Sequence, residues 1–242
     1  MNLSIVIPAF NEEKLLSSCL EEIGSAGELL TRRGWDWEVI VCDNNSSDAT
    51  AEIAASLGAT VVAEPVNQIG RARNTGASVA KGEWLLFVDA DSLVSPLLFE
   101  ELMEAVGSGK VVGGGACLTV KEKNLGHLMI PLHIWNGVSR IFGYAAGSFL
   151  FCRRDVFEGL DGFSLERYAG EELDLSRRLK RAGKKEGLAF RILRKGRLQT
   201  SARKLELYST WEILSMFLKV IVRYKGTTGN RDACFLWYDG RR

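Results

Sequence analysis

Two aspartates near the middle of the chain have a spacing that suits chemistry on a phosphate-bearing ligand. Asp89 and Asp91 stand at the end of an apolar run over residues 83–89 that is typical of a buried strand. In an extended segment, residues two apart face the same side, so both carboxylates can point at one place. Such carboxylates repel each other unless a cation lies near them, and Mg²⁺ commonly combines one or two carboxylates with substrate phosphates. An Asp-Ala-Asp tripeptide is also compatible with a solvated acidic turn, so the motif alone does not establish a metal site.

A second acidic pair opens a predicted helix later in the chain. Glu171 and Glu172 begin a helical pattern over residues 171–182, and Leu175 and Leu179 anchor one face of it in the core. Acids in a first turn suit the helix dipole, so capping electrostatics alone explains the pair unless other motifs give it a role.

Short apolar strands alternate with helices in the elements that must position these acids. We expect strands over residues 3–8, 38–43, 59–63 and 83–89, and helices over 14–30, 48–57, 69–80 and 96–106. This alternation predicts a parallel sheet with right-handed crossovers and covered faces. Ligands bind beyond the carboxyl ends of such strands. Since Pro8, Asp43 and Asp89 lie at three of these ends, the first half of the chain should build a ligand crevice.

The order of elements is less regular after residue 110. We expect strands over residues 110–120 and 148–153, a mixture of helix and loop over 122–142, and helices over 171–182 and 205–223. We predict one domain over residues 1–203, in which the order of elements changes at about residue 110. A C-terminal helical extension would follow over 204–242.

The bulk composition favours an ordinary globular protein. The chain has 242 residues and a formal net charge of +1, which gives no reason to expect nucleic acid as a partner. Its five cysteines contain no CxxC pair and fit a reducing cytosol, and the two histidines, His127 and His133, cannot build a histidine-rich metal centre. Without a signal peptide or an apolar run long enough to span a bilayer, we expect a cytoplasmic protein.

Four motifs in series give the acids a context. They occur in order and at short spacings, as Val6–Glu13, Val41–Asp48, Gly70–Gly76 and Phe87–Asp91. In these motifs the chain resembles the family 2 glycosyltransferases over about residues 3–185. The resemblance implies the GT-A fold, an α/β Rossmann-like sandwich with a mostly parallel central sheet and helices on both faces. It also implies that residues 1–203 form the catalytic domain, with a nucleotide-binding half at 1–110 and an acceptor half at 111–203.

The resemblance also implies roles for matching residues. The nucleobase and ribose would be held by Asp43 and by the segment Pro8, Ala9, Phe10, Asn11 and Glu12. Arg71 would lie near the nucleotide, where it can give charge-assisted hydrogen bonds to phosphate. A surface salt bridge on a helix explains Arg71 or Arg73 equally well, and Asn74 is expected to make a helix-packing contact. At the Asp-Ala-Asp motif, Asp91 resembles the direct ligand of Mg²⁺ or Mn²⁺, and Asp89 the ribose- or metal-side acid, with Ala90 between them.

The acidic pair resembles the family's Glu-Asp pair, whose second acid is the general base. Glu172 holds that position, one methylene longer than the usual Asp, so the choice between Glu171 and Glu172 stays open. Many family members carry a late histidine in the metal shell, whereas residues 198–203 contain none. Gln199, water or the diphosphate could complete that shell, and Arg203 could hold phosphate.

The expected reaction is transfer of a sugar, with inversion, from a nucleotide-diphosphate sugar to an acceptor hydroxyl on a glycan, a lipid or a small molecule. Family frequency favours UDP as the nucleotide. A nucleotidyltransferase would need a Gly-rich basic loop where residues 8–13 stand, and a non-catalytic nucleotide-binding protein would not need these acids. The apolar helix over 205–224 should pack in the core or a homodimer, or dock peripherally at the inner face of a membrane.

Overall fold

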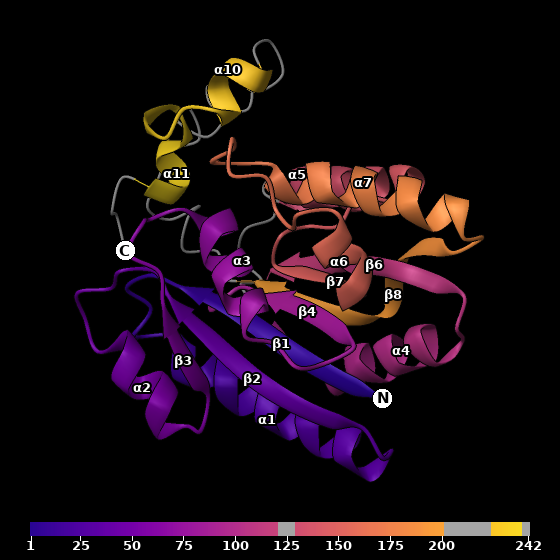
Figure 1. Cartoon of the computed structure of the whole chain (residues 1–242), viewed down its shortest axis with the longest axis horizontal. Helices are drawn as coiled ribbons and strands as arrows, with labels where there is room; N and C mark the ends of the chain where they lie inside the picture. The colour runs from indigo at the N-terminus through magenta and orange to yellow at the C-terminus, as the bar shows by residue number, and fades with distance from the viewer. Residues whose placement is uncertain (121–128, 201–223, 239–242) are drawn as a thin grey trace.

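The computed structural model describes residues 1–120, 129–200 and 224–238 (Figure 1). The first half alternates strands and helices as expected, although several boundaries move by one to a few residues. Its elements are β1 (Asn2–Ala9), α1 (Leu16–Arg32), β2 (Asp36–Asp43), α2 (Thr50–Ser56), β3 (Thr60–Ala63), α3 (Ile69–Ser78) and β4 (Trp84–Val88). Strand β1 pairs in parallel with both β2 and β4, and β2 pairs in parallel with β3.

The second half extends the same sheet with mixed directions. Its elements are β5 (Ser92–Val94), α4 (Pro96–Gly107), β6 (Val111–Val120), α5 (Met129–Phe142), β7 (Phe149–Arg153), α6 (Arg154–Gly159), α7 (Glu171–Lys185) and β8 (Ala189–Thr200). The sheet order is β3-β2-β1-β4-β7-β6-β8-β5. Strand β7 runs antiparallel to its neighbours β4 and β6, whereas β6 and β8 pair in parallel. The predicted α/β fold with a mostly parallel sheet is confirmed.

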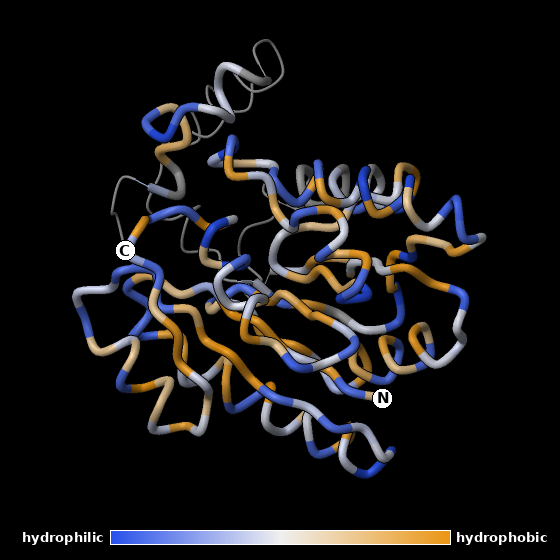
Figure 2. The backbone as a smooth tube through the Cα atoms, viewed as in Figure 1, coloured by the Kyte–Doolittle hydropathy of each residue, from blue (hydrophilic) through white to orange (hydrophobic). Residues whose placement is uncertain are grey.

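Alternation along the strands explains why helices cover both faces of the sheet. In β1, Leu3, Ile5 and Ile7 face one hydrophobic cluster and Val6 faces the other. In β4, Leu86 and Phe87 divide in the same way because successive side chains point to opposite faces. Helices α1 and α4 contribute to the first cluster, and α3, α6 and α7 lie on the opposite face (Figure 1). Figure 2 shows the hydrophobic residues concentrated along these central strands.

Three elements are absent from the sequence-based expectation: β5, α6 and β8. Strand β8 is the largest omission, because its segment carries four basic residues that interrupt any apolar alternation.

The C-terminal segment contains α10 (Tyr224–Thr228), a 3₁₀ turn (Asp232–Cys234) and α11 (Phe235–Tyr238). The helix predicted over 205–223 lies outside the described residues, and the proposed division into domains at residue 203 stays a prediction. In the described part of the chain, no helix has the length and apolar character needed to cross a bilayer.

A buried carboxylate anchors the unpredicted strand β8. Glu101, on α4, is 3% exposed and accepts hydrogen bonds from the backbone N–H groups of Arg194, Lys195 and Gly196, at donor–acceptor distances from 2.7 to 3.3 Å. These bonds satisfy backbone donors in the middle of β8, where the chain comes against α4. A single side chain therefore replaces a neighbouring strand as the partner of this segment.

Glu101→Leu should destabilise the protein strongly, because three backbone donors lose their charged acceptor together. We expect a loss of about 3 kcal/mol or more in the free energy of unfolding. For a chain of this size, that corresponds to a melting temperature lower by roughly 6–12 °C. Glu104→Leu is the matched control on the same helix. Its carboxylate bridges Lys195 at 2.7 Å on the surface, and such exposed pairs contribute little. Equal shifts in the two variants would contradict the anchoring role.

Candidate active site

Two loops at the carboxyl ends of β1 and β2 interlock to form one rim of the candidate site. The backbone N–H of Asn11 donates to Ser46 Oγ at 3.0 Å, and Asn11 Oδ1 accepts from the backbone N–H of Ser47 at 2.8 Å. The N–H of Glu12 donates to Thr50 Oγ1 at 2.8 Å. Asn11 itself adopts a left-handed conformation with φ of 52°, which asparagine tolerates better than most residues. The predicted nucleotide-binding segment is thereby held in one shape.

Asp43 and Arg71 flank this rim from different elements. Asp43 ends β2, is half-buried, and accepts a hydrogen bond from the backbone N–H of Ser46 at 3.3 Å. Arg71 lies in the first turn of α3 and is half-buried as well. Its Nε is buried and finds no hydrogen-bond partner among the described residues. An anionic group of a ligand is the kind of partner that would satisfy it.

The Asp-Ala-Asp motif lies in a turn rather than in a strand. Strand β4 ends at Val88, and the backbone N–H of Ser92 donates to the carbonyl of Asp89 at 3.0 Å. The backbone at Asp89–Asp91 is therefore not extended, and the expectation of an extended segment here is wrong. Asp89 and Asp91 are both half-buried, one on each side of the buried Ala90. The turn keeps both acids at the carboxyl edge of the sheet beside the rim.

Arg73 is the central residue of the site, and its burial rules out the surface salt bridge that was one of its two expected roles. It is 3% exposed and extends from α3 into the space between β4 and α7. Its Nη2 lies 2.9 Å from Asp89 Oδ1 and 3.1 Å from the carbonyl oxygen of Gly147, and its Nη1 lies 2.7 Å from Glu171 Oε1. The guanidinium also stands 5.2 Å from the centre of the Phe163 ring. One side chain thus ties the aspartate motif to the glutamate pair.

The charge of Arg73 is maintained by its neighbours. Burial lowers the pKa of a guanidinium, but the carboxylates of Asp89 and Glu171 outweigh this effect and raise the pKa of Arg73 above its ordinary value. Gly147 is required for this arrangement, because a Cβ there would lie 2.7 Å from Arg73 Nη2. The spacing of Gly70, Arg73 and Ala77 along the buried face of α3 is the sequence signal that could have indicated a buried arginine.

The two glutamates at the start of α7 lie in different environments. Glu171 is 4% exposed and bound to Arg73. Glu172 is half-buried, and burial, reinforced by the negative charge of Glu171, raises the pKa of Glu172 to about 8. Arg73 acts in the opposite direction on Glu172 but does not cancel the shift. Glu171 is therefore held in an ion pair with Arg73. The raised pKa of Glu172 suits a base that works near neutral pH.

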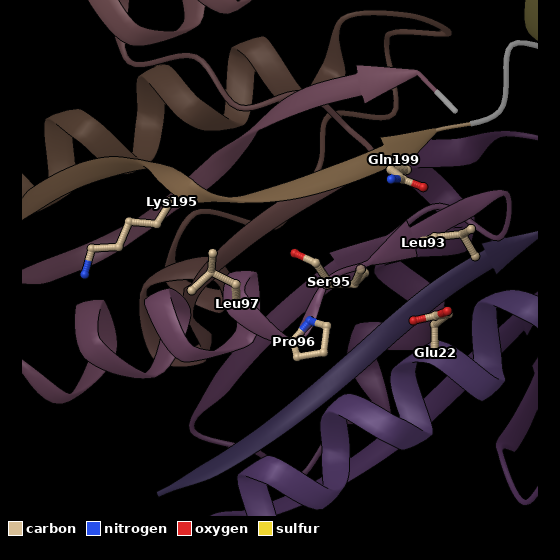
Figure 3. A pocket seen from close by; sticks show the side chains of 8 residues that line it. Glu22, Leu93, Ser95, Pro96, Leu97, Lys195 and Gln199 are labelled. Carbon is tan, nitrogen blue, oxygen red and sulfur yellow. The ribbon is translucent and has the colours of Figure 1, made fainter. Parts of the chain in front are cut away.

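Other predicted residues are placed as supports or lie elsewhere. Asn74 makes two hydrogen bonds with the backbone of Phe163, both at 2.9 Å, so the expected packing contact is confirmed. Gln199 lines a separate pocket of about 400 Å³ between α1, β5 and β8 (Figure 3). Arg203 and His127 lie outside the described residues. Within the described ranges, no cluster of three or more His, Cys, Asp or Glu side chains could hold a metal ion.

The C-terminal segment contacts the site in a way that the sequence did not indicate. The hydroxyl of Tyr238, in α11, accepts a hydrogen bond from the backbone N–H of Ile69 at 3.2 Å, at the start of α3. Its ring packs edge-on against Tyr168 at 5.5 Å. Burial and the nearby charge of Glu171 raise the pKa of Tyr238. Residues 224–238 therefore pack beside the elements that carry Arg73 and Glu171.

Comparison with known proteins identifies a family and several relatives of this chain. Residues 4–159 match the family model described as Glycosyl transferase family 2. Over 101 residues the chain is 35% identical to a poly(ribitol-phosphate) beta-glucosyltransferase of Bacillus spizizenii, covering 39% of this chain and 15% of that protein. Over 173 residues it is 30% identical to a dolichyl-phosphate beta-glucosyltransferase of Trichomonas vaginalis, covering 62% and 53%. The matches thus span less than two thirds of either relative.

A solved structure extends the likeness to nearly the whole fold. Glucosyl-3-phosphoglycerate synthase from Mycobacterium tuberculosis, in complex with Mn²⁺, UDP and glucosyl-3-phosphoglycerate, aligns with a TM-score of 0.63. The alignment covers 100% of this chain and 81% of that protein, at 17% sequence identity. At this identity, the likeness establishes the fold and leaves the substrates open.

Proposed function

The chain belongs to glycosyl transferase family 2, and on this basis we propose that it transfers a sugar from a nucleotide-diphosphate sugar to an acceptor hydroxyl, with inversion. The observation that carries the proposal is the cluster around Arg73, which joins Asp89 and Glu171 beside Glu172 at the carboxyl edge of the sheet. An acid with a raised pKa beside a buried ion pair is typical of catalytic sites, which supports an enzyme over a protein that only binds nucleotides.

We propose UDP as the nucleotide, since solved structures of similar fold contain UDP or UDP-glucose. The rim of residues 8–12 and Asp43 would hold the nucleoside, because Asp43 can accept from a base N–H or a sugar hydroxyl. Arg71 would bind the diphosphate, which would give its buried Nε an acceptor. The acceptor hydroxyl stays open among glycans, lipids and small molecules.

The acids of the Asp-Ala-Asp turn fit a divalent cation. Asp89 and Asp91 offer hard carboxylate oxygens, and Asp89 is partly open, with 34% of its side chain exposed. Two carboxylates do not fill an octahedral shell, so the diphosphate and water would complete it, as is usual for Mg²⁺. We propose that Asp91, with Asp89, holds Mg²⁺ or Mn²⁺. When bound, this ion would supply positive charge to stabilise the departing diphosphate.

Side chains of the protein would carry out the remaining steps of sugar transfer. Arg73 holds Asp89 in place through one carboxylate oxygen, and Arg71 adds positive charge on the diphosphate side. Glu172 would take the proton from the acceptor hydroxyl as it attacks the anomeric carbon from the face opposite the diphosphate. The C–O bond to the acceptor forms as the bond to the diphosphate oxygen breaks, and a single displacement of this kind inverts the anomeric centre.

Asp91→Asn tests the proposed donor and metal site. Because a ligand that binds only the folded protein raises the melting temperature, wild type should be stabilised by UDP and Mn²⁺ together more than by UDP alone. Asp91→Asn should lose most of this metal-dependent part and keep the part due to UDP alone. An unchanged metal-dependent shift would remove Asp91 from the metal site.

A set of nucleotides separates the proposed reaction from its rivals. UDP, GDP, dTDP and CMP are compared by thermal shift, each with and without Mn²⁺, and hydrolysis of matching nucleotide sugars is then followed. Release of UDP from a UDP-sugar supports the proposal. Binding of nucleotides without any hydrolysis or transfer would favour a non-catalytic protein, and pyrophosphate release from a nucleoside triphosphate and a sugar phosphate would favour a nucleotidyltransferase.

A further inference from the structure

Two neighbouring hydrophobic side chains at the end of α5 are unusually open to solvent. Ile141 is 78% exposed and Phe142 is 58% exposed, the highest values among the exposed large hydrophobic residues of the described chain. Isolated exposed hydrophobic residues are common and need no explanation. An adjacent pair at a helix end, beside several basic side chains, is a more specific feature.

Basic residues predominate on the two helices that carry and flank this pair. Helix α5 and residues 175–185 of α7 together contain seven basic residues and no acidic residue. Since the whole chain has a net charge of only +1, the rest of the molecule carries a net negative charge. Five of the basic side chains on these two helices are exposed: Arg140, Arg177, Arg181, Lys184 and Lys185.

Direct contacts join the hydrophobic and basic side chains into one surface. Lys180 Nζ donates to the carbonyl of Phe142 at 2.5 Å and stands 4.3 Å from the centre of the Tyr144 ring. Phe142 stacks on Tyr144 with ring centres 6.4 Å apart. Arg177 lies over the same ring and donates to its hydroxyl at 3.3 Å. These contacts bring the end of α5 against the middle of α7, and the two helices lie along the same side of the sheet (Figure 1).

We propose that this surface, the α5–α7 patch formed by Ile141, Phe142, Tyr144, Arg177, Lys180 and Arg181, docks the protein on an anionic lipid bilayer. An anionic bilayer offers both components that the patch matches. Its headgroups attract basic side chains, and its interface accepts apolar and aromatic side chains to a shallow depth. A soluble polyanion would use the basic residues but would gain nothing from Ile141 and Phe142. The combination therefore favours a lipid surface.

Co-sedimentation of the full chain with vesicles tests the proposal. Wild type should bind vesicles of phosphatidylcholine with phosphatidylglycerol, bind pure phosphatidylcholine weakly, and dissociate as salt is raised. Arg177→Gln with Arg181→Gln should weaken binding at least ~10-fold, since each basic residue near an anionic surface contributes about fivefold in affinity. Ile141→Ser with Phe142→Ser should also weaken it by ~10-fold or more, because it removes the apolar part.

Matched variants on another part of the surface serve as controls. Leu57→Ser with Val79→Ser removes two hydrophobic residues that are 45% and 41% exposed, and Arg32→Gln with Arg33→Gln removes two exposed basic residues. Both control pairs should bind vesicles as wild type does. All of the substituted residues are exposed, and an unchanged melting temperature confirms that each variant is folded.

Three outcomes would overturn the proposal. Wild type could stay in the supernatant with anionic vesicles at low salt, or the control pairs could lose binding as much as the patch variants. Alternatively, soluble polyphosphate could compete fully while Ile141→Ser with Phe142→Ser has no effect, which would make the patch a polyanion site. Vesicle binding needs neither donor nor turnover, so its failure would leave the proposed transfer reaction unaffected.

Discussion

Arg73→Met is expected to abolish sugar transfer and to reduce folding stability by about 3–5 kcal/mol, because it leaves a buried carboxylate without its partner. The two side chains of the pair, Arg73 and Glu171, are 3% and 5% exposed. Without the guanidinium, Glu171 must either take up a proton or remain charged in a poorly solvated space. Asp89 would also lose the contact that holds its carboxylate at the edge of the sheet.

A second substitution separates stability from function at this position. In Arg73→Met with Glu171→Met, an apolar pair replaces the ion pair, and such replacements are often neutral or stabilising. We expect this double variant to recover most of the melting temperature but none of the transfer activity. Arg73→Lys keeps the charge but lacks the planar fork that reaches two carboxylates and a carbonyl at once, so it should recover only part of each property.

Thermal unfolding and a single-turnover transfer assay provide the two measurements. A loss of about 3–5 kcal/mol corresponds to roughly 6–20 °C in melting temperature for a protein of this size. An Arg73→Met variant that unfolds and reacts like wild type would show that the ion pairs around Arg73 carry neither stability nor function.

The alternation of strands and helices was sufficient to predict β1, β2, β3 and β4 and the helices between them. The segments around β1, β2 and β4 are almost uninterrupted apolar runs, a pattern produced when helices bury both faces of a parallel sheet. The polar residues that end these runs must then share one edge. For this reason Asp43 and Asp89 could be placed at the same edge of the sheet from the order of the elements alone.

In the second half of the chain, local sequence patterns do not reveal the presence of β8 or the direction of β7. Strand β8 satisfies part of its backbone through Glu101, a side chain 93 residues earlier in the chain, so its own sequence need not show strand periodicity. Strand β7 runs antiparallel to both neighbours, and no local pattern records direction. The direction of β7 and the formation of β8 therefore depend on contacts between residues far apart in the sequence, which local periodicity does not reveal.

The site itself was predicted in part. Burial of Arg73 depends on carboxylates from the turn after β4 and from α7, which lie 16 and 98 residues away. Local sequence could therefore not exclude a surface salt bridge for Arg73. The choice between the two glutamates did have a local signal. Glu171 precedes Leu175 and Leu179 by four and eight residues, which puts it on the buried face of α7, whereas Glu172 is rotated by about 100°. The helical spacing thus already distinguishes a structural acid from an accessible one.

Glu172→Gln is expected to reduce transfer by about 10²–10⁴-fold while leaving nucleotide binding intact, because general-base catalysis contributes that much and the amide cannot accept the proton. Glu171→Gln should cost less in transfer and more in melting temperature, since Glu171 is the buried partner of Arg73. Glu172→Asp keeps a carboxylate and should retain more activity than Glu172→Gln. A larger loss of transfer in Glu171→Gln than in Glu172→Gln would assign the base to Glu171.

The pH dependence of the reaction gives an independent test of the same assignment. A base must be deprotonated to act, and the pKa of Glu172 is raised to about 8. Transfer by wild type should therefore be slow near pH 6, rise with an apparent pKa near 8, and level off above it. Glu172→Gln should show a low rate without this rise. A wild-type profile that is flat between pH 6 and 9 would contradict the proposed role.

The raised pKa of Glu172 also predicts how folding stability depends on pH. Whereas transfer activity should rise with pH, stability should fall. Because the pKa of Glu172 rises from 4.5 to about 8 on folding, the folded state binds its proton more tightly than the unfolded state. The contribution of Glu172 to stability is full below pH 4.5 and is lost as pH rises to about 8. The melting temperature of wild type should thus fall across this range by more than that of Glu172→Gln, which has no proton to lose. Equal slopes for the two proteins would mean that folding does not perturb Glu172, and the acid that drives any pH-dependent activity would then have to lie elsewhere in the site.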